Sequence, residues 1–167
     1  MGRISRKFDM VKIRPAVPAD AERIYLIHRA SIATLCKGHY SDQDIKGWIE
    51  VLSPEIYETP IREKRMIVAE ENEELTGFGI FNAASKEICA LYLHPAAKGT
   101  GLGKSLLFEL ENRARQEGIS DLALCATTNA LGFYEHHGYI RKETVNHELP
   151  NGIRLICSRM YKTLDVR

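Results

Sequence analysis

Three glycines, Gly99, Gly101 and Gly103, follow an apolar run that ends at Leu93 and overlap the start of a leucine-rich run that begins at Leu102. Glycine adopts positive φ angles and lets a ligand approach the main chain, but it costs about 0.5–1 kcal/mol relative to alanine in regular structure. Three such costs so close together indicate that the backbone is presented to a ligand. A helix that begins after this loop would offer free N–H groups and the positive end of its dipole, which together form an anion site.

The residues after the loop predict a helix followed by a strand. One helical stripe is formed by Leu102, Leu106, Leu107, Leu110 and Ala114. Two pairs at i,i+4 spacing, Glu109–Arg113 and Glu111–Arg115, are expected on the outer surface of this helix. The run 121–127 reads as the next strand. A strand, loop, helix and strand of this length imply a right-handed crossover and local parallel pairing.

The rest of the chain predicts an α+β fold, in which a mixed, mostly antiparallel sheet is flanked by helices. Polar turns separate three apolar runs that read as an antiparallel meander, and a turn at Pro150–Gly152 predicts a hairpin. The remaining expected elements are a strand at 10–14, a helix after Pro18, a second helix at 42–51, meander strands at 66–69, 76–81 and 88–93, and a short helix at 129–137. We expect one domain over residues 10–167 and a disordered lead-in over residues 1–9.

Composition excludes several classes of protein. The net charge of +1 gives no reason to expect nucleic acid or a membrane surface as a partner, and no apolar run approaches the roughly 20 residues that a bilayer requires. The four cysteines form no C-x-x-C pair, and Cys89 and Cys125 lie in apolar runs, where reduced thiols behave as small hydrophobes. A cytoplasmic location fits this pattern best. The six histidines show no metal spacing, so we expect no metal.

Two nucleotide motifs match the glycine loop only in part. A phosphate loop of nucleotide triphosphatases needs its first glycine at position 98, which is lysine. The dinucleotide motif G-x-G-x-x-G needs its third glycine at position 104, which is also lysine.

A third pattern matches in register. The segment Lys98–Gly103, preceded by Leu91–Pro95, resembles the [Arg/Gln]-x-x-Gly-x-[Gly/Ala] pyrophosphate loop of the GNAT superfamily of N-acetyltransferases, with Lys98 where that family usually has Arg or Gln. The segment Asn129–Ile140, NALGFYEHHGYI, resembles the second signature of the same superfamily. The order of the expected elements is also that of the family.

The resemblance implies a GNAT-type fold that binds acetyl-CoA as acetyl donor. The main chain of the loop would hold the pyrophosphate, the strand before it would hold the pantetheine arm, and Asn129 would hold the amide portion. The cofactor-binding residues that it implies are Leu91, Tyr92, Leu93, Lys98, Gly99, Thr100, Gly101, Leu102, Gly103, Lys104, Asn129 and Tyr134.

The resemblance also implies the catalytic groups. Tyr134 matches the tyrosine that protonates the leaving thiolate, a phenol that stays protonated at neutral pH. A main-chain N–H near Leu91 would meet the oxyanion. An amine acceptor must lose a proton before it attacks, and Glu87 matches the base of one branch of the family, whereas other members use a water chain. The acceptor cleft of the family is lined here by candidates in Ser31–Trp48, namely Cys36, His39, Tyr40 and Trp48.

The function that follows is transfer of the acetyl group of acetyl-CoA to a primary amine by direct attack in a ternary complex. The acceptor is a small amine or amino-acid derivative, a protein N-terminus or a lysine, and a homodimer is left open. The alternative is a CoA-binding regulatory or sensing module with this fold and little turnover. These two interpretations differ in whether an amine accelerates the release of CoA.

Overall fold

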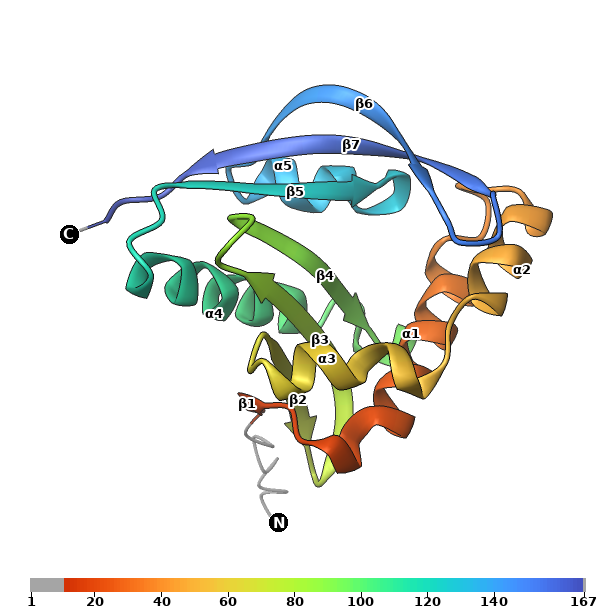
Figure 1. Ribbon diagram of the computed structural model, residues 1–167, viewed down its shortest axis with the longest axis horizontal. Coiled ribbons are helices and arrows are strands. Elements are labelled where there is room, and N and C mark those ends of the chain that lie inside the picture. The colour runs from red at the N-terminus through yellow and green to blue at the C-terminus, as the bar shows by residue number, and fades with distance from the viewer. Residues whose placement is uncertain (1–10, 167) are drawn as a thin grey trace, which may run out of the picture.

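A computed structural model describes residues 11–166 of the protein, so the lead-in expected at 1–9 lies outside the described residues. Apart from α3 and the short 3-10 turns, the strands and helices follow the predicted order along the chain (Figure 1). The strands are β1 (Lys12–Pro15), β2 (Met66–Glu71), β3 (Glu74–Asn82), β4 (Glu87–Leu93), β5 (Asp121–Thr127), β6 (Ile140–Glu148) and β7 (Arg154–Thr163). The α-helices are α1 (Ala21–Leu35), α2 (Asp42–Glu50), α3 (Glu58–Arg62), α4 (Leu102–Gln116) and α5 (Leu131–His136). Short 3-10 turns are η1 (Pro18–Asp20), η2 (Pro54–Tyr57), η3 (Pro95–Ala97) and η4 (Thr128–Ala130).

One seven-stranded sheet in the order β1-β2-β3-β4-β5-β7-β6 forms the centre of the molecule. All neighbouring strands are antiparallel except β4 and β5, which are parallel. The mixed, mostly antiparallel sheet, the meander and the parallel crossover predicted from the sequence are therefore confirmed.

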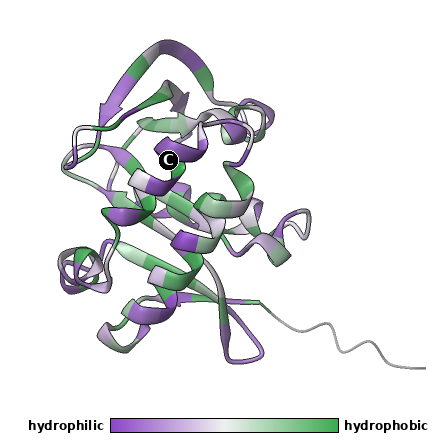
Figure 2. Cartoon of the chain, turned by 90° about the vertical axis from the view of Figure 1, so that its right-hand side faces the viewer, coloured by the Kyte–Doolittle hydropathy of each residue, from purple (hydrophilic) through white to green (hydrophobic). Residues whose placement is uncertain are grey.

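Helices cover both faces of this sheet. Leu106 and Leu110 of α4 pack in one apolar cluster with Leu122 and Leu124 of β5. On the other face, α1, α2 and α3 bury a second set of side chains against the strands, including Ile24, Ile32, Trp48, Tyr57, Ile61, Phe78 and Leu155. Figure 2 shows hydrophilic segments along much of the outer strand β6, which forms the edge of the sheet.

The sheet splits between β4 and β5. These two strands pair only at Glu87 with Ala123 and at Ile88 with Leu124, and then diverge (Figure 1). A register shift in β4 lies at the same place: Ile80 of β3 faces Ala90 and Phe81 faces Ile88, so Cys89 is an extra residue. Such a bulge bends its strand and increases the local twist. The bulge therefore accounts for the divergence that opens the sheet.

Several details differ from the sequence-based expectations. Glu111 is only 2% exposed, not on the outer surface, because it accepts hydrogen bonds from Tyr139 Oη (3.0 Å) and Lys162 Nζ (2.9 Å). Cys89 and Cys125 are exposed, not packed as small hydrophobes, since they lie on the face of their strands opposite α4. The sequence analysis also missed α3, which has a proline inside it.

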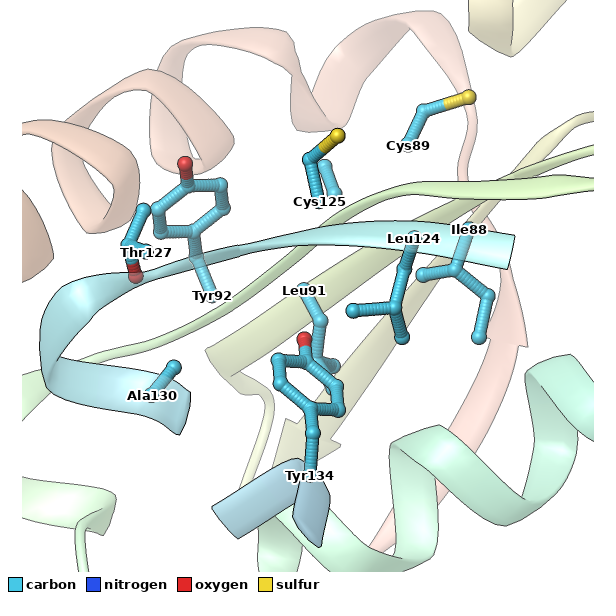
Figure 3. Close-up of a pocket in the computed structure, with 10 residues that line it drawn as sticks. Ile88, Cys89, Leu91, Tyr92, Leu124, Cys125, Thr127, Ala130 and Tyr134 are labelled. Atoms are coloured by element: carbon cyan, nitrogen blue, oxygen red, sulfur yellow. The ribbon is translucent and has the colours of Figure 1, made fainter. Parts of the chain in front are cut away.

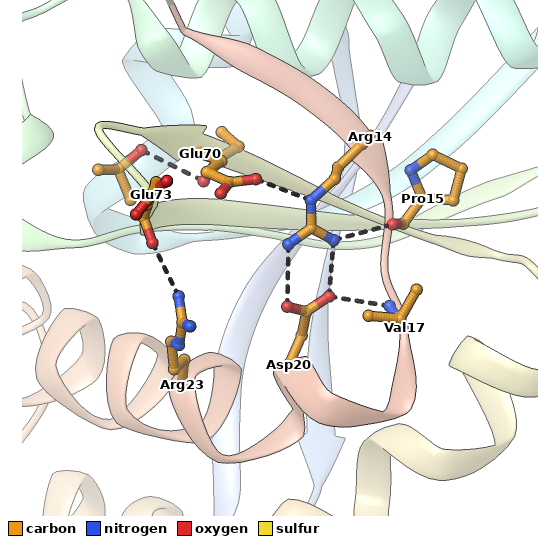
Figure 4. A network of polar contacts seen from close by, with 9 residues as sticks. Arg14, Pro15, Val17, Asp20, Arg23, Glu70 and Glu73 are labelled. Atoms are coloured by element: carbon orange, nitrogen blue, oxygen red, sulfur yellow. Dashed lines mark hydrogen bonds and ion pairs between the residues drawn. The ribbon is translucent and has the colours of Figure 1, made fainter.

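A buried ion pair fixes the start of the fold (Figure 4). Arg14 of β1 binds both carboxylate oxygens of Asp20, at 2.8 and 3.0 Å, and donates from Nε to Glu70 of β2 at 2.8 Å. Burial opposes ionisation of Asp20, but the hydrogen bonds from Arg14 and from the Val17 N–H outweigh it and lower the pKa of this carboxyl group. The network joins β1, η1 and β2 at the entry to α1.

Candidate active site

A cleft of about 470 Å³ lies where the diverging strands meet the start of α4. Its lining comes from α1, the end of β4, the glycine loop, the end of β5 and α5, which are separate in the sequence. The lining residues are Ser31, Leu35, Cys36, His39, Leu91, Tyr92, Leu93, Lys98, Gly99, Gly101, Gly103, Lys104, Thr127, Asn129, Ala130, Phe133, Tyr134 and His137. Most of the predicted cofactor-binding residues are thus brought together in one concave site.

The glycine loop forms an open main-chain cradle in this cleft. Gly99 and Gly101 have φ angles of +78° and +86°, and a Cβ atom at either position would meet nothing within 4 Å. These glycines are therefore needed for their backbone conformation and for open space, not for packing within the protein. Gly103 differs, because its Cβ would come within 3.3 Å of the Phe133 ring.

The first turn of α4 opens onto the cradle. Ser105 N donates to Gly101 O at 3.2 Å, which starts the helical ladder. The N–H groups that precede the first such bond lack helical acceptors, and the helix dipole adds partial positive charge there. Lys98 and Lys104 line the same part of the cleft. This arrangement suits an anion such as a pyrophosphate.

The exposed edge of β4 forms one wall of the cleft. Beyond Ile88 this strand has no paired residue on β5, so its main-chain polar groups on that side are available to a ligand. Leu91, Tyr92 and Leu93 lie on this free stretch and line the cleft. An extended chain can bind here as an additional strand would.

Tyr134 of α5 points into the space between the diverging strands (Figure 3). Its side chain is 7% exposed, and burial raises the pKa of its hydroxyl above the ordinary value. The hydroxyl is therefore protonated at neutral pH and can act as a proton donor. A smaller cavity of about 40 Å³, lined by Tyr134, Leu91, Cys89 and Cys125 among others, continues from this point toward the opposite face of the sheet.

The turn that carries Asn129 is hydrogen-bonded to residues that are distant in the sequence. The Cys36 Sγ donates to Asn129 Oδ1 at 3.5 Å, and burial raises the pKa of this thiol to about 11. The Tyr40 hydroxyl donates to Ile156 O at 2.6 Å and accepts from Thr128 N at 3.0 Å. Asn129 makes no side-chain cap for α5. Its amide is thus held at the edge of the cleft by the segment after α1.

Glu87 lies at the opposite end of β4 from the glycine loop. Its carboxylate accepts a hydrogen bond from Arg159 of β7, with which it forms an ion pair. Glu87 lies four positions before Leu91 along the strand, a distance of about 13 Å. Glu87 is therefore placed at the point where the strands part and not in the cleft itself.

Some predicted residues do not line the cleft with their side chains. Leu102 is buried in the core, and the Thr100 hydroxyl donates to Ala97 O at 2.6 Å. Trp48 packs in the core between α2 and β7, whereas Cys36 and His39 do line the cleft. The sequence analysis placed Ser31 in the cleft region without singling it out, and it missed Phe133 and His137 as lining residues. Phe133 and His137 lie within the second signature, one helical turn apart, and this spacing could have predicted that both face the cleft.

Among the described residues, no group of three or more His, Cys, Asp or Glu side chains could hold a metal ion.

Comparisons with known proteins agree with the family resemblance found in the sequence. Residues 36–163 match the family model of the acetyltransferase (GNAT) domain. A curated relative, an uncharacterized N-acetyltransferase ycf52 from Pyropia yezoensis, is 33% identical over 73 residues, which cover 42% of this chain and 42% of that protein. The aligned part thus spans less than half of the relative's length. Within residues 11–166, no helix combines the length and the apolar character that crossing a membrane requires.

Solved structures match over nearly the whole chain. A GCN5-related N-acetyltransferase from Rhodopseudomonas palustris has a TM-score of 0.86 and 27% identity, with coverage of 92% of this chain and 95% of that one. PaiA N-acetyltransferase from Thermoplasma acidophilum, solved with coenzyme A, has a TM-score of 0.75, 24% identity and coverage of 93% and 99%. The match to the family model over residues 36–163 shows that the chain belongs to the GNAT acetyltransferase family.

Proposed function

We propose that the protein is an N-acetyltransferase that moves the acetyl group of acetyl-CoA to a primary amine by direct attack. The observation that carries this proposal is the open cradle at Gly99 and Gly101, which faces a cleft that Tyr134 also lines. When bound, acetyl-CoA supplies an acetyl thioester. The first turn of α4 would hold its pyrophosphate, the free edge of β4 its pantetheine arm, and Asn129 its amide portion.

The chain's own groups account for the remaining chemistry. The main-chain N–H near Leu91 would donate to the thioester oxygen, where negative charge develops during attack, and such a donor contributes about 3 kcal/mol when well placed. Tyr134 would donate its proton to the departing sulfur, since burial keeps the phenol protonated.

The acceptor amine must lose a proton first. An amine with a pKa of about 10.4 is neutral only about once in 2,500 molecules at pH 7. We propose that water molecules in the small cavity behind Tyr134 carry this proton toward the opposite face of the sheet, where Glu87 or bulk solvent accepts it. The distance of about 13 Å along β4 favours a water chain over direct contact with Glu87.

We assign the acceptor only as a primary amine. A cytoplasmic location and a homodimer remain expectations from the sequence. A screen of small amines, peptide N-termini and lysine peptides for acetyl-CoA-dependent thiol release tests the proposal. We expect at least one class to accelerate CoA release. The alternative, a CoA-binding sensing module, predicts cofactor affinity without acceleration by any amine.

A further inference from the structure

Two cysteines lie opposite each other where the sheet opens. Ile88 and Leu124 are the last paired residues of β4 and β5, and Cys89 and Cys125 are the next residues on the two strands. Figure 3 shows both sulfur-bearing side chains on the same side of the strands, with Ile88 and Leu124 on the other side. Both cysteines line the small cavity that Tyr134 also lines.

This pair differs from the other two cysteines of the chain. Cys89 and Cys125 are exposed, whereas Cys36 and Cys157 are buried. Thiols exchange with disulfides only where the reagent can reach them. Of the four thiols, the two that directly follow the last pair of β4 and β5 are therefore also the two that solvent reaches.

The backbone geometry suits a covalent link. Neighbouring strands lie about 4.7–4.9 Å apart where they pair, and a disulfide requires Cα atoms about 4.4–6.8 Å apart. Because the cysteines directly follow the last pair, the strands have only begun to separate there. The Cys89 thiol now donates to Glu87 O of its own strand at 3.8 Å, so the bridge requires a rotation about its Cα–Cβ bond.

We propose that Cys89 and Cys125 form a dithiol that a small-molecule disulfide oxidises to an intramolecular disulfide across the mouth of this cavity. Arg159 Nη1 donates to the Cys125 sulfur at 3.6 Å, so a thiolate there has a positively charged donor in place. The Cys125 thiolate attacks the small-molecule disulfide and releases one thiol. The Cys89 thiolate then attacks the Cys125 sulfur and releases the second. The dithiol loses two electrons and two protons, and the oxidant becomes two thiols.

The bridge would cover the end of the cavity that lies opposite Tyr134. This consequence rests on the proposed function, in which the cavity serves the amine and its proton. The cradle around Gly101 lies elsewhere in the site and is not covered. Oxidation therefore lowers amine-dependent turnover and leaves affinity for acetyl-CoA unchanged.

Oxidation with oxidised glutathione tests the assignment without any activity measurement. We expect the protein to lose two of its four thiols and the mass of two hydrogen atoms, with peptide mapping that joins Cys89 to Cys125. Cys89→Ser should stop at a mixed disulfide with one glutathione and form no internal bridge. The matched control Cys157→Ala, which removes a buried thiol, should still form the bridge. An unbridged protein, a bridge between other cysteines or a covalent dimer would overturn the proposal.

A second measurement tests whether the disulfide, once formed, lowers amine-dependent turnover. The bridged protein and the same protein after reduction with dithiothreitol are compared in thiol release with an accepted amine and in acetyl-CoA binding. We expect the bridged protein to have lost turnover, the reduced protein to have recovered it, and both to bind acetyl-CoA equally. A mapped bridge with unchanged turnover would overturn the covering of the cavity. A protein that transfers no acetyl group would refute the proposed function and leave the mapped bridge in place.

Discussion

Replacing Gly101 with alanine separates ligand binding from backbone strain. Gly101 has a φ of +86° and faces the cleft, and Gly118, just beyond the end of α4, has a φ of +72°. At both positions a Cβ meets nothing within 4 Å. Each alanine variant should therefore lose a similar free energy of unfolding, about 1–2 kcal/mol, because both place an L-residue in the left-handed region.

Only the Gly101 variant should also lose affinity for acetyl-CoA. A methyl group in the cradle, or a shift of the loop to relieve strain, disturbs N–H donors that would hold a charged phosphate. Hydrogen bonds to charged groups contribute about 1.5–3 kcal/mol each. Losing most of the energy of two such bonds therefore weakens acetyl-CoA binding on the order of a hundredfold. Isothermal titration calorimetry measures the affinity and urea unfolding the stability. If Gly101→Ala bound acetyl-CoA like Gly118→Ala, the cradle would not be the phosphate site.

Four further substitutions test separate parts of the structure. Tyr134→Phe should lower kcat by about 10²–10⁴-fold and leave acetyl-CoA affinity unchanged, as steady-state kinetics and calorimetry can show; unchanged kcat would exclude the general acid. Glu87→Gln should lower kcat if the carboxylate accepts the proton, and an unchanged kcat in steady-state kinetics would assign that step to water alone. His28 is a buried residue of α1, and burial lowers its pKa to about 3, below its unfolded value of about 6.5, so stability is lost as pH falls from 6.5 toward 3. His28→Gln should flatten that loss in urea titrations at several pH values, and a slope equal to the parent's would refute this origin. Arg14→Leu should destabilise the fold by about 3 kcal/mol because it leaves the buried Asp20 carboxylate unpaired, and a change near zero in urea unfolding would show that the pair contributes little.

Short-range sequence patterns predicted the strand and the glycine loop that border the site. The strand at 121–127 has the bounds that the sequence indicated, and the glycine loop opens α4 as expected. Both rest on short-range signals: an apolar run bounded by turn residues, and glycines ahead of a helical stripe. The parallel pairing of β4 and β5 followed from the length of the crossover between them.

Features that depend on register and long-range contacts were not predictable. The bulge at Cys89 is a property of how β4 aligns with β3, and an apolar run reads the same with or without it. Glu111 has the spacing of a surface ion pair, yet Lys162 from β7 covers it, 51 residues away. The bond from Thr128 N to Tyr40 Oη crosses 88 residues. No pattern within a single element carries that information.

Direct titration of the unmodified protein with acetyl-CoA tests the central claim, with ATP–Mg²⁺ and NAD as controls, in a calorimeter. We expect saturable binding of acetyl-CoA alone, with a matching rise in the unfolding midpoint, since a ligand at 100 times its Kd adds about 2.7 kcal/mol to stability. Binding of ATP–Mg²⁺ alone, or no binding of acetyl-CoA, would contradict the assignment of the glycine loop and, with it, the roles proposed for Tyr134 and Glu87.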